Sequence, residues 1–459
     1  MTAAIALDLG STSIKAAMVD RQGVLQHLVT KPAPEMNVHE GRYECSALDY
    51  VEIVEQVLNA CLAHSAEKPP LGLCSQRSSF LIWNKTSGTP LTPLISWQDD
   101  RGMSSCERLH AHTQTIRALT GLQLTPYYFA PKLSALLQEN PTWREKLSTH
   151  EWLAGTLDTF LIWRWSGKQQ FITDASMAAR TLLMDIHTQQ WSEELCNMFG
   201  IPRAILPRIV PSTELNLPLD NGLTLQASVG DQSAALIASL ADNRSEALVN
   251  LGTGGFVIRA LAQNESAFDG YLQTLVYRSG EHPTQFAIEG TLNSIALALA
   301  GYPTGECEFT DLATNRIFCL AEPSGLGAPY FRPDWGIHFS ESVTTLTRQQ
   351  IAALLLEAIV FRVARILEEF HRHTPLTGIY LSGGLSGLAC LQQGIAQCTN
   401  IPVYHLQQQE TSLQGAAILA SGFKLTIQRH AQPIVIRHPN TTLTEKYRDW
   451  KIWLDGLLK

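Results

Sequence analysis

Short apolar runs separated by small polar turns open the chain. Residues Ile5–Lys15 (IALDLGSTSIK) predict a buried strand, a turn of Gly, Ser and Thr, and the start of a second strand that continues to Val19. The polar turn Asp20–Gly23 then leads into a further strand over residues 24–29. The start of the chain therefore predicts three consecutive strands joined by tight turns.

The same strand–turn–strand pattern returns near the middle of the chain, at Ala247–Ile258 (ALVNLGTGGFVI). Leu9-Gly10-Ser11 matches Leu251-Gly252-Thr253 at an offset of 242 residues, and Asn250 stands where the first copy has Asp8. This duplication predicts two related lobes that face each other. Small residues in such turns let backbone N–H groups and hydroxyls approach phosphate oxygens. Two unrelated hairpins are the alternative, but the matched spacing favours a phosphate loop in each half.

Apolar positions at helical spacing follow two N-terminal capping patterns. Ser46-x-x-Asp49 precedes an apolar face at Val51–Leu62, and Thr347-x-x-Gln350 precedes another at Ile351–Ile359. Residues 233–240 also read as a helix. Because strands alternate with helices in both halves, we expect an α/β fold.

The length of the chain supports a division into two parts. Its 459 residues are too many for one core and suit two domains or two large lobes. No low-complexity linker is visible, so we expect one lobe over residues 1–240, another over residues 241–459, and a hinge near residue 240. Hydrophobic residues make up 45% and charged residues 17%, which is typical of a globular chain rather than a disordered one.

Charge, cysteine content and missing motifs argue against several classes of protein. A net charge of −8 and a pI near 6.0 argue against nucleic acid or an anionic membrane as the main partner. The nine Cys form no C-x-x-C pair, which favours reduced thiols of a cytoplasmic protein over a zinc site. The N-terminus does not read as a signal peptide, and no apolar run reaches the ~18 residues that span a bilayer, so we expect a soluble protein. Neither a P-loop motif nor a Rossmann G-x-G-x-x-G after a strand occurs.

Further motifs follow one another in an order typical of one enzyme family. They are Asp8-x-Gly10-Ser11-Thr12-Ser13, Ser75-Gln76-Arg77, Trp97-Gln98-Asp99-Asp100-Arg101, Gly121–Tyr127 leading to Lys132, Gly155–Thr188, Gly230-Asp231-Gln232, Ser324–Tyr330, Leu381-Ser382-Gly383-Gly384 and Glu410–Ala417. From the first strand to about Ser421 the chain resembles the FGGY carbohydrate kinases, and among them the glycerol kinases most of all. The resemblance implies an α/β, two-lobed, actin-like (ribonuclease H-like) ATPase fold, with duplicated βββαβα cores and a cleft between the lobes. It also implies an ATP- and Mg²⁺-dependent kinase that phosphorylates a hydroxyl of a small sugar or polyol.

The resemblance and the chemistry of the residues together suggest the site. Asp231 would be the catalytic base that takes the acceptor proton, and a helix N-cap is the alternative. Asp8 is assigned to Mg²⁺, and a turn-capping Asp is the alternative. ATP contacts are assigned to both turns and a glycine pair: Gly10, Ser11, Thr12, Ser13, Gly252, Thr253, Gly254, Gly383 and Gly384. Arg supplies fixed donors to hydroxyls and aromatic rings supply flat walls, so the acceptor pocket is assigned to Arg77, Trp97, Tyr127, Asp231 and Gln232.

The chain also departs from the glycerol kinase pattern. Ser78 stands where those kinases have a glutamate that holds glycerol hydroxyls, and Leu388 replaces an adenine-side asparagine. The glycine-rich insert tied to allosteric control is missing between Thr213 and Gly230, so we expect no such regulation. A ketopentose (ribulose- or xylulose-type) kinase and a degenerate, non-catalytic nucleotide-binding protein are therefore the alternatives. The expected partner is a small molecule, and the homodimer frequent among such kinases is a candidate assembly.

Overall fold

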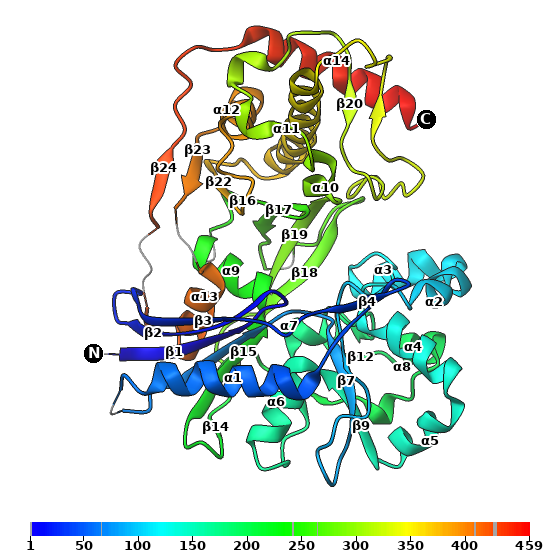
Figure 1. Ribbon diagram of the computed structural model, residues 1–459, viewed down its shortest axis with the longest axis vertical. Helices are drawn as coiled ribbons and strands as arrows, with labels where there is room; N and C mark the ends of the chain where they lie inside the picture. The colour runs from blue at the N-terminus through cyan, green and yellow to red at the C-terminus, as the bar shows by residue number, and fades with distance from the viewer. Residues whose placement is uncertain (1, 66, 241–242, 264, 408–409, 426–428) are drawn as a thin grey trace. The chain divides into compact units, whose positions relative to one another are not determined.

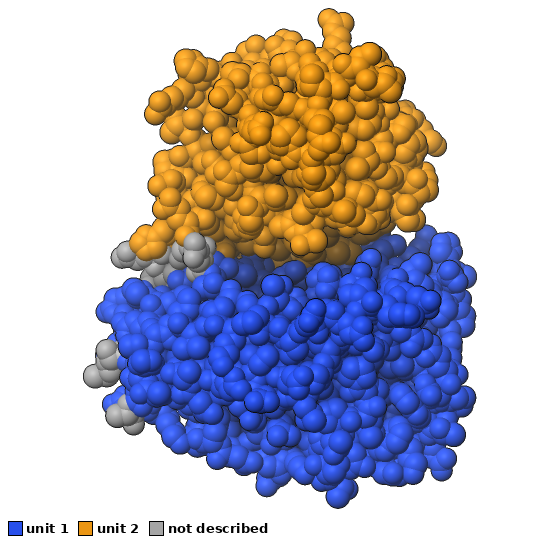
Figure 2. All heavy atoms as spheres, viewed as in Figure 1, with its two compact units in different colours: residues 1–238, 273–286, 410–428 blue, residues 239–272, 287–409, 429–459 orange. Residues whose placement is uncertain are grey.

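A computed structural model describes residues 2–65, 67–240, 243–263, 265–407, 410–425 and 429–459 (Figure 1). The chain divides into two compact units, which Figure 2 colours separately. The first unit contains Met1–Ala238, Gln273–Phe286 and Glu410–Gln428, and the second contains Ser239–Leu272, Ala287–Gln409 and Arg429–Lys459. The boundary expected near residue 240 is close to the first crossing between the units, beside residues 241 and 242, which lie outside the described ranges. The segments Gln273–Phe286 and Glu410–Gln428 also belong to the first unit, so one boundary in the sequence does not separate the two units.

A six-stranded sheet in the first unit has the order β14-β15-β6-β1-β2-β3. Its strands are β1 (Thr2–Leu9), β2 (Ser13–Asp20), β3 (Leu25–Pro32), β6 (Leu71–Ser75), β14 (Leu217–Pro218) and β15 (Thr224–Gly230). β1, β2 and β3 pair antiparallel, whereas β6 runs parallel to both β1 and β15. β1 and β6 are buried along most of their length, as expected for central strands that carry apolar residues on both faces. The three strands predicted at the start of the chain are confirmed.

A seven-stranded sheet contains the second copy, in the order β18-β19-β17-β16-β22-β23-β24. Its strands are β16 (Glu246–Leu251), β17 (Gly255–Ala260), β18 (Leu272–Tyr277), β19 (Gln285–Leu292), β22 (Gly378–Ser382), β23 (Val403–Leu406) and β24 (Ala431–Pro433). β16 and β17 pair antiparallel, as do β17 and β19, while β16, β22 and β23 run parallel. The run β19-β17-β16-β22-β23 therefore repeats the order and directions of β3-β2-β1-β6-β15. The duplication predicted from the matched hairpins is confirmed.

Helices connect and cover these strands. They are α1 (Ala47–Leu62), α6 (Leu157–Trp165), α7 (Ala175–Ala178), α9 (Asp231–Leu240), α10 (Ile295–Leu299), α11 (Arg348–His373), α12 (Ala389–Thr399), α13 (Thr411–Ala420) and α14 (Thr441–Leu457). Ser46 caps α1 by accepting a hydrogen bond from Asp49 N at 3.2 Å, and Thr347 and Gln350 form a reciprocal capping box on α11. Both predicted helix starts are confirmed.

Helix α13 packs against β1, β6 and β15 of the first sheet (Figure 1). The approach is so close that a Cβ at Gly72 of β6 would lie 2.2 Å from Ala416 O of α13. On another side of the helix, a Cβ at Gly415 would lie 1.8 Å from Ala234 O of α9. Two glycines thus allow α13 to fit against both the sheet and α9.

A smaller sheet of the first unit has the order β4-β5-β8-β7-β9. Its strands are β4 (Asn37–His39), β5 (Arg42–Cys45), β7 (Phe80–Asn84), β8 (Leu94–Ile95) and β9 (Trp152–Thr156). It shares a hydrophobic core with several helices of the same region: α3 (Thr113–Thr120), α4 (Phe129–Glu139), α5 (Pro141–Ser148) and α8 (Glu193–Phe199). A further helix, α2 (Met103–Arg108), packs against α4. Since the link from β6 to β7 carries Arg77, this sheet positions the segments to which the acceptor is assigned.

Short elements complete the part of the chain that the structure describes. Three two-stranded pairs are β10 (Ile172–Asp174) with β13 (Arg208–Val210), β11 (Met184–Asp185) with β12 (Gln190–Trp191), and β20 (Cys319–Leu320) with β21 (His338–Phe339). Single 3₁₀ turns cover His110–His112, Arg203–Ile205, Thr304–Glu306 and Phe309–Asp311. None of the helices in the described ranges is both long enough and apolar enough to span a membrane.

Candidate active site

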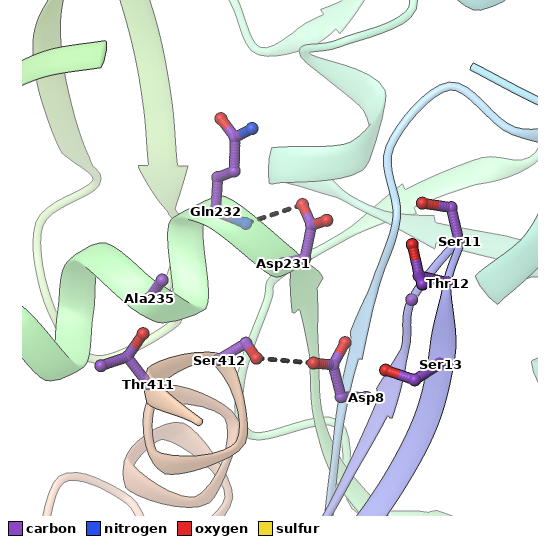
Figure 3. Close-up of a pocket in the computed structure, with 10 residues that line it drawn as sticks. Asp8, Ser11, Thr12, Ser13, Asp231, Gln232, Ala235, Thr411 and Ser412 are labelled. Atoms are coloured by element: carbon purple, nitrogen blue, oxygen red, sulfur yellow. Dashed lines mark hydrogen bonds between the residues drawn. The ribbon is translucent and has the colours of Figure 1, made fainter. Parts of the chain in front are cut away.

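A pocket in the first unit collects residues from three distant parts of the sequence (Figure 3). The turn after β1, the start of α9 and the start of α13 supply its lining: Asp8, Gly10, Ser11, Thr12, Ser13, Asp231, Gln232, Ala235, Thr411 and Ser412. β1 and β15 are both parallel to β6, so their carboxyl ends lie at one edge of the sheet. The structure thereby brings together the predicted base, the predicted metal ligand and the first predicted phosphate turn.

Asp8 is the buried carboxylate of this pocket. The residue is 9% exposed, and Ser412 Oγ donates a hydrogen bond to its Oδ2 at 2.6 Å. Its Oδ1 is buried without a hydrogen-bond partner among the described residues. Burial raises the pKa of Asp8 to about 6; Ser412 opposes this rise and the carboxylate of Asp231 adds to it. A buried oxygen without a partner, close to a second carboxylate, favours a cation as its ligand.

The turn after β1 presents hydroxyls to the pocket. Ser11, Thr12 and Ser13 are partly or fully exposed, whereas Gly10 is anchored because Tyr50 Oη donates to its carbonyl at 2.8 Å. A Cβ at Gly10 would lie 2.5 Å from Ser13 O, so the turn has room only for glycine there. The result is a tight turn whose hydroxyls and N–H groups are free to meet phosphate oxygens.

Asp231 begins α9 directly after β15. Gln232 N donates to Asp231 Oδ1 at 2.7 Å, and Arg77 Nε lies 3.6 Å from the same oxygen. Arg77 also donates to Gln232 Oε1. Burial raises the pKa of Asp231, while Arg77, the Gln232 N–H and Arg180 oppose the rise. The side chain of Asp231 is 33% exposed, so it is at once the first residue of a helix and a carboxylate that a ligand can reach.

The start of α13 contributes residues that the sequence interpretation did not assign to the site. Thr411 and Ser412 line the pocket, and Glu410 Oε2 lies 2.6 Å from Lys15 Nζ. Lys15 is thus paired with a carboxylate. The boundary expected near residue 240 assigns Glu410–Ala417 to the second lobe, whereas the structure places it in the first unit. With α9 and α13 both starting at the pocket, two helix N-termini offer N–H donors and a positive potential to an anion.

Arg77 is the acceptor candidate that the structure brings to Asp231. Trp97 and Tyr127 are 37% and 47% exposed and are not among the described residues that line the pocket of Figure 3. Trp97 is tied to the segment of Arg77, because its backbone N–H donates to Ser79 Oγ at 2.9 Å. Burial, followed by the nearby Asp100, raises the pKa of Tyr127. Trp97 and Tyr127 therefore lie at the surface of the first unit and not in its core.

Ser78, the residue that replaces a glutamate of the glycerol kinases, is engaged with backbone. It is 6% exposed, and its Oγ donates to Arg180 O at 2.9 Å. Its φ of 64° lies in the left-handed region that non-glycine residues seldom occupy. The position beside Arg77 therefore offers an acceptor no carboxylate, and its hydroxyl already has a partner.

The predicted nucleotide residues of the second half gather at one edge of the second sheet. Gly252 N donates to Gly254 O at 2.9 Å, and Thr253 O accepts from Ala296 N at 3.2 Å. Gly383, with a φ of 90°, packs so closely that a Cβ would lie 2.5 Å from Leu251 O. By contrast, a Cβ at Gly384 would meet nothing within 4 Å. The turn after β16 and the glycine pair after β22 thus lie together within the second unit, and Gly384 has open space in front of it.

The donor set of the pocket suits Mg²⁺ better than a transition metal. The described residues contain no group of three or more His, Cys, Asp or Glu side chains placed to hold a metal ion. Mg²⁺ does not require one, because it keeps several waters and commonly binds one or two carboxylates together with substrate phosphates. Asp8, with its unpartnered Oδ1 and with Asp231 nearby, fits this mode of binding.

Sequence reasoning missed three residues that shape this pocket. Ser412 binds Asp8, Glu410 binds Lys15, and Tyr50 holds the carbonyl of Gly10. The stretch Glu410–Ala417 stood out only as a motif of the family, and nothing in it indicated the sheet against which it packs. Tyr50 carried no signal, because it lies among the apolar positions of α1.

Comparison with solved structures gives the class of protein. The crystal structure of Plasmodium falciparum glycerol kinase with ADP matches this chain with a TM-score of 0.84 at 22% identity, over 99% of this chain and 98% of that one. The chain therefore has the predicted two-lobed actin-like ATPase fold.

Comparison with sequences gives the family. Residues 3–248 match the N-terminal domain, and residues 247–422 the C-terminal domain, of the FGGY family of carbohydrate kinases. The chain is 32% identical to the glycerol kinase of Trichlorobacter lovleyi over 451 residues, covering 92% of this chain and 90% of that protein. It is 30% identical to the apulose kinase of Pectobacterium atrosepticum over an alignment of 490 residues, covering 97% and 96%. The chain belongs to the FGGY family of carbohydrate kinases, as its motifs predicted.

Proposed function

We propose that this chain is an ATP-dependent kinase that transfers the γ-phosphate to a hydroxyl of a small polyol or sugar, in the manner of the glycerol kinases. The observation that carries the proposal is Asp231 held beside Arg77, in one pocket with Asp8 and the turn Gly10–Ser13. Membership of a carbohydrate kinase family and 32% identity to a glycerol kinase support it.

Asp231 is the proposed general base. The acceptor oxygen attacks the γ-phosphorus, its proton passes to a carboxylate oxygen of Asp231, and the bond from phosphorus to the β–γ bridging oxygen breaks to release ADP. A positioned base of this kind contributes about 10²–10⁴ in rate. Arg77 holds Asp231 and Gln232 in place and, together with Gln232, is proposed to bind acceptor hydroxyls.

Several groups of the chain are proposed to stabilise the negative charge of the phosphates. Bound Mg²⁺ would neutralise phosphate charge, and Asp8 is the carboxylate that would hold it, directly or through water. The N–H groups and hydroxyls of residues 10–13, with the N-termini of α9 and α13, would donate to phosphate oxygens. In the second unit, residues 252–254 and the pair Gly383–Gly384 are proposed to contact the nucleotide.

A ketopentose acceptor is the second candidate. Ser78 favours it, because a small side chain bonded to Arg180 O stands where the glycerol kinases have a glutamate that holds glycerol hydroxyls. The segment beside Arg77 therefore carries a smaller side chain and one negative charge fewer than the glycerol kinase pattern. The apulose kinase of Pectobacterium atrosepticum, 30% identical over 97% of this chain, is a relative whose name indicates an acceptor other than glycerol.

A coupled assay of ADP release tests the proposal. Purified protein with ATP and Mg²⁺ would be screened against glycerol, erythritol, ribulose, xylulose and related compounds. We expect ADP release that depends on one or a few of these acceptors and is lost in Asp231→Asn. Absence of ADP release with every acceptor would instead support a non-catalytic nucleotide-binding protein, and release at one rate with and without acceptors would support ATP hydrolysis rather than an acceptor kinase.

A further inference from the structure

Lys132 is a fully buried lysine on α4. Its exposure is 0%, and its Nζ donates hydrogen bonds to Ser78 O at 2.9 Å and to Ser96 O at 2.7 Å. Nζ also lies 5.7 Å from the centroid of the Phe80 ring. Lysine is among the residues least often fully buried, because its ammonium loses hydration that few protein sites replace. The position of this amine therefore calls for an explanation beyond core packing.

The two carbonyls that Lys132 binds lie beside the two acceptor candidates. Ser78 follows Arg77 on the link from β6 to β7, and Ser96 precedes Trp97 just after β8. These two segments are separate in the sequence, and the lysine amine joins one to the other.

A second tie connects the same two segments. Trp97 N donates to Ser79 Oγ at 2.9 Å, and Ser79 Oγ donates to Gln76 Oε1 at 2.8 Å. Ser79 and Gln76 are both buried, at 0% and 4% exposure. Ser78, between them, holds a strained left-handed φ of 64°. Such a conformation persists only where its surroundings fix it, and the hydrogen bond from Lys132 to its carbonyl is one such restraint.

Asp99, the acidic residue near Lys132, already has a cationic partner in Arg101, which also pairs with Glu44. Asp99 is buried and pairs with Arg101, whose Nε lies 2.7 Å from Asp99 Oδ1. Burial lowers the pKa of Lys132 to about 7; Asp99 opposes this and Arg101 adds to it. The amine has enough N–H groups for both carbonyls whether it is charged or neutral. Lys132 thus serves as a hydrogen-bond donor rather than as the partner of an acidic residue.

We propose that Lys132 is a positioning residue of the acceptor site: its amine fixes the carbonyls of Ser78 and Ser96 and so sets the placement of Arg77 and Trp97. The inference rests on the proposed function, since it assumes that these two side chains bind the acceptor. It assigns Lys132 no contact with either substrate. Loss of the amine should therefore loosen acceptor binding and leave the nucleotide turns as they are.

The chain offers a matched control in Lys446 of α14. That lysine is 6% exposed, and its Nζ lies 2.5 Å from Glu357 Oε2 in the second unit. Lys446→Met and Lys132→Met both remove a buried amine, but only Lys132 joins the two acceptor segments. Comparing them separates a general loss of stability from a specific effect on the acceptor.

The experiment measures kcat, both KM values and the unfolding temperature of wild type, Lys132→Met, Lys132→Gln and Lys446→Met. The acceptor is the best one found with the wild type. We expect Lys132→Met to raise the acceptor KM about tenfold or more and to leave the ATP KM within about twofold. Lys132→Gln, which keeps amide donors on a shorter side chain, should lie between it and wild type. Lys446→Met should lower the unfolding temperature without moving the acceptor KM.

Specific outcomes would overturn the proposal. An unchanged acceptor KM in Lys132→Met, or equal rises of both KM values, would show that Lys132 only supports the fold. If Lys132→Met does not fold, a wild-type acceptor KM in Lys132→Gln overturns the proposal, whereas a raised one supports it. Absence of acceptor-dependent turnover in the wild type would instead overturn the proposed function, and this inference with it.

Discussion

The two duplicated sheets differ in the side chains they carry at matching positions. The first has Asp8 near the end of β1, where the second has Asn250 near the end of β16. In the first sheet, the segment that follows β6 carries Arg77. In the second sheet, the segment that follows β22 carries Gly383 and Gly384, which have no side chains. Strand order and direction are the same in both runs, so the difference lies in the side chains and not in the backbone plan.

In the proposed function, this difference assigns the reacting carboxylates to the first copy. The first edge gathers two carboxylates in one pocket, with the guanidinium of Arg77 beside Asp231, and burial raises the pKa of both carboxylates. The second edge offers the amide of Asn250, the hydroxyl of Thr253 and the backbone of its glycines, and a Cβ at Gly384 would meet nothing within 4 Å. In the proposed function the first copy carries the groups that move a proton and hold a cation, while the second binds nucleotide. A repeated scaffold can therefore host two roles by changes at a few strand ends.

The largest effect is expected from Asp231→Asn. The amide keeps the size of the side chain and can still accept from the Gln232 N–H, but it cannot take a proton from the acceptor. We expect kcat to fall at least about a hundredfold, with ATP affinity nearly unchanged. Steady-state kinetics and titration calorimetry with ATP measure the two quantities. Turnover close to wild type would remove Asp231 from the mechanism.

The next effect is expected from Asp8→Asn, which gives the first edge the side chain that the second has at residue 250. Activity should fall about tenfold or more at limiting Mg²⁺, because a neutral amide holds the cation poorly. Magnesium titrations of activity and of acceptor binding check this, and acceptor affinity should change less. An unchanged dependence on Mg²⁺ would make Asp8 a turn residue only.

The same variant has an opposite effect on stability. The folded-state pKa of Asp8, about 6, is above its ordinary 3.8, so the folded chain binds this proton more tightly than the unfolded chain. Stability from this group is present below pH 3.8 and is lost as pH rises through 6. Asp8→Asn should therefore be more stable than wild type at pH 8, by about 1–3 kcal/mol, and gain less at pH 5. Denaturant unfolding at both pH values measures this gain, and equal stability at pH 8 would contradict it.

Gly252→Val tests the second edge. A Cβ at residue 252 would meet only Gly254 O, at 4.0 Å, so the fold has room for an added side chain. That side chain would crowd a nucleotide bound against this turn. We expect ATP affinity to fall about tenfold or more and acceptor affinity to stay within about twofold, as measured by calorimetry. Gly10→Ala is the contrasting variant, because its Cβ would lie 2.5 Å from Ser13 O and should lower the unfolding temperature. If Gly252→Val loses the acceptor as completely as ATP, the division of roles between the two edges is wrong.

The remaining prediction concerns stability alone and is the pH dependence that comes from Lys132. Its pKa is about 7 in the folded chain and ordinarily 10.5, so the unfolded chain binds more protons between these values. The free energy of unfolding should therefore rise as the pH rises from 7 toward 10.5. Lys132 contributes at most about 1.4 kcal/mol to this rise per pH unit. Urea unfolding at three pH values should show a shallower rise in Lys132→Met. A rise as steep as that of the wild type would argue against the buried, deprotonated amine.

Local patterns made much of this molecule predictable. The matched hairpins and both capped helices follow from turn chemistry within a few residues of sequence. The assignment of Asp8 and Asp231 to the site needed the resemblance to the FGGY kinases as well. The contact between Ser412 and Asp8 joins residues 404 positions apart, and no local pattern signals such a pairing. Lys132 lies in a helical segment, where a lysine reads as solvent-exposed, and only the packing of α4 against the Ser78 and Ser96 segments makes it buried. The return of residues 410–428 to the first unit is likewise a property of packing.

The most direct test of the account follows the phosphoryl group itself. Wild type and Asp231→Asn would be incubated with γ-labelled ATP, Mg²⁺ and the best acceptor, and the labelled products would be separated. The account predicts label in a phosphate ester of the acceptor for wild type, formed at least about a hundredfold more slowly by Asp231→Asn. Label found only as inorganic phosphate, or ester formed equally fast by both proteins, would contradict it.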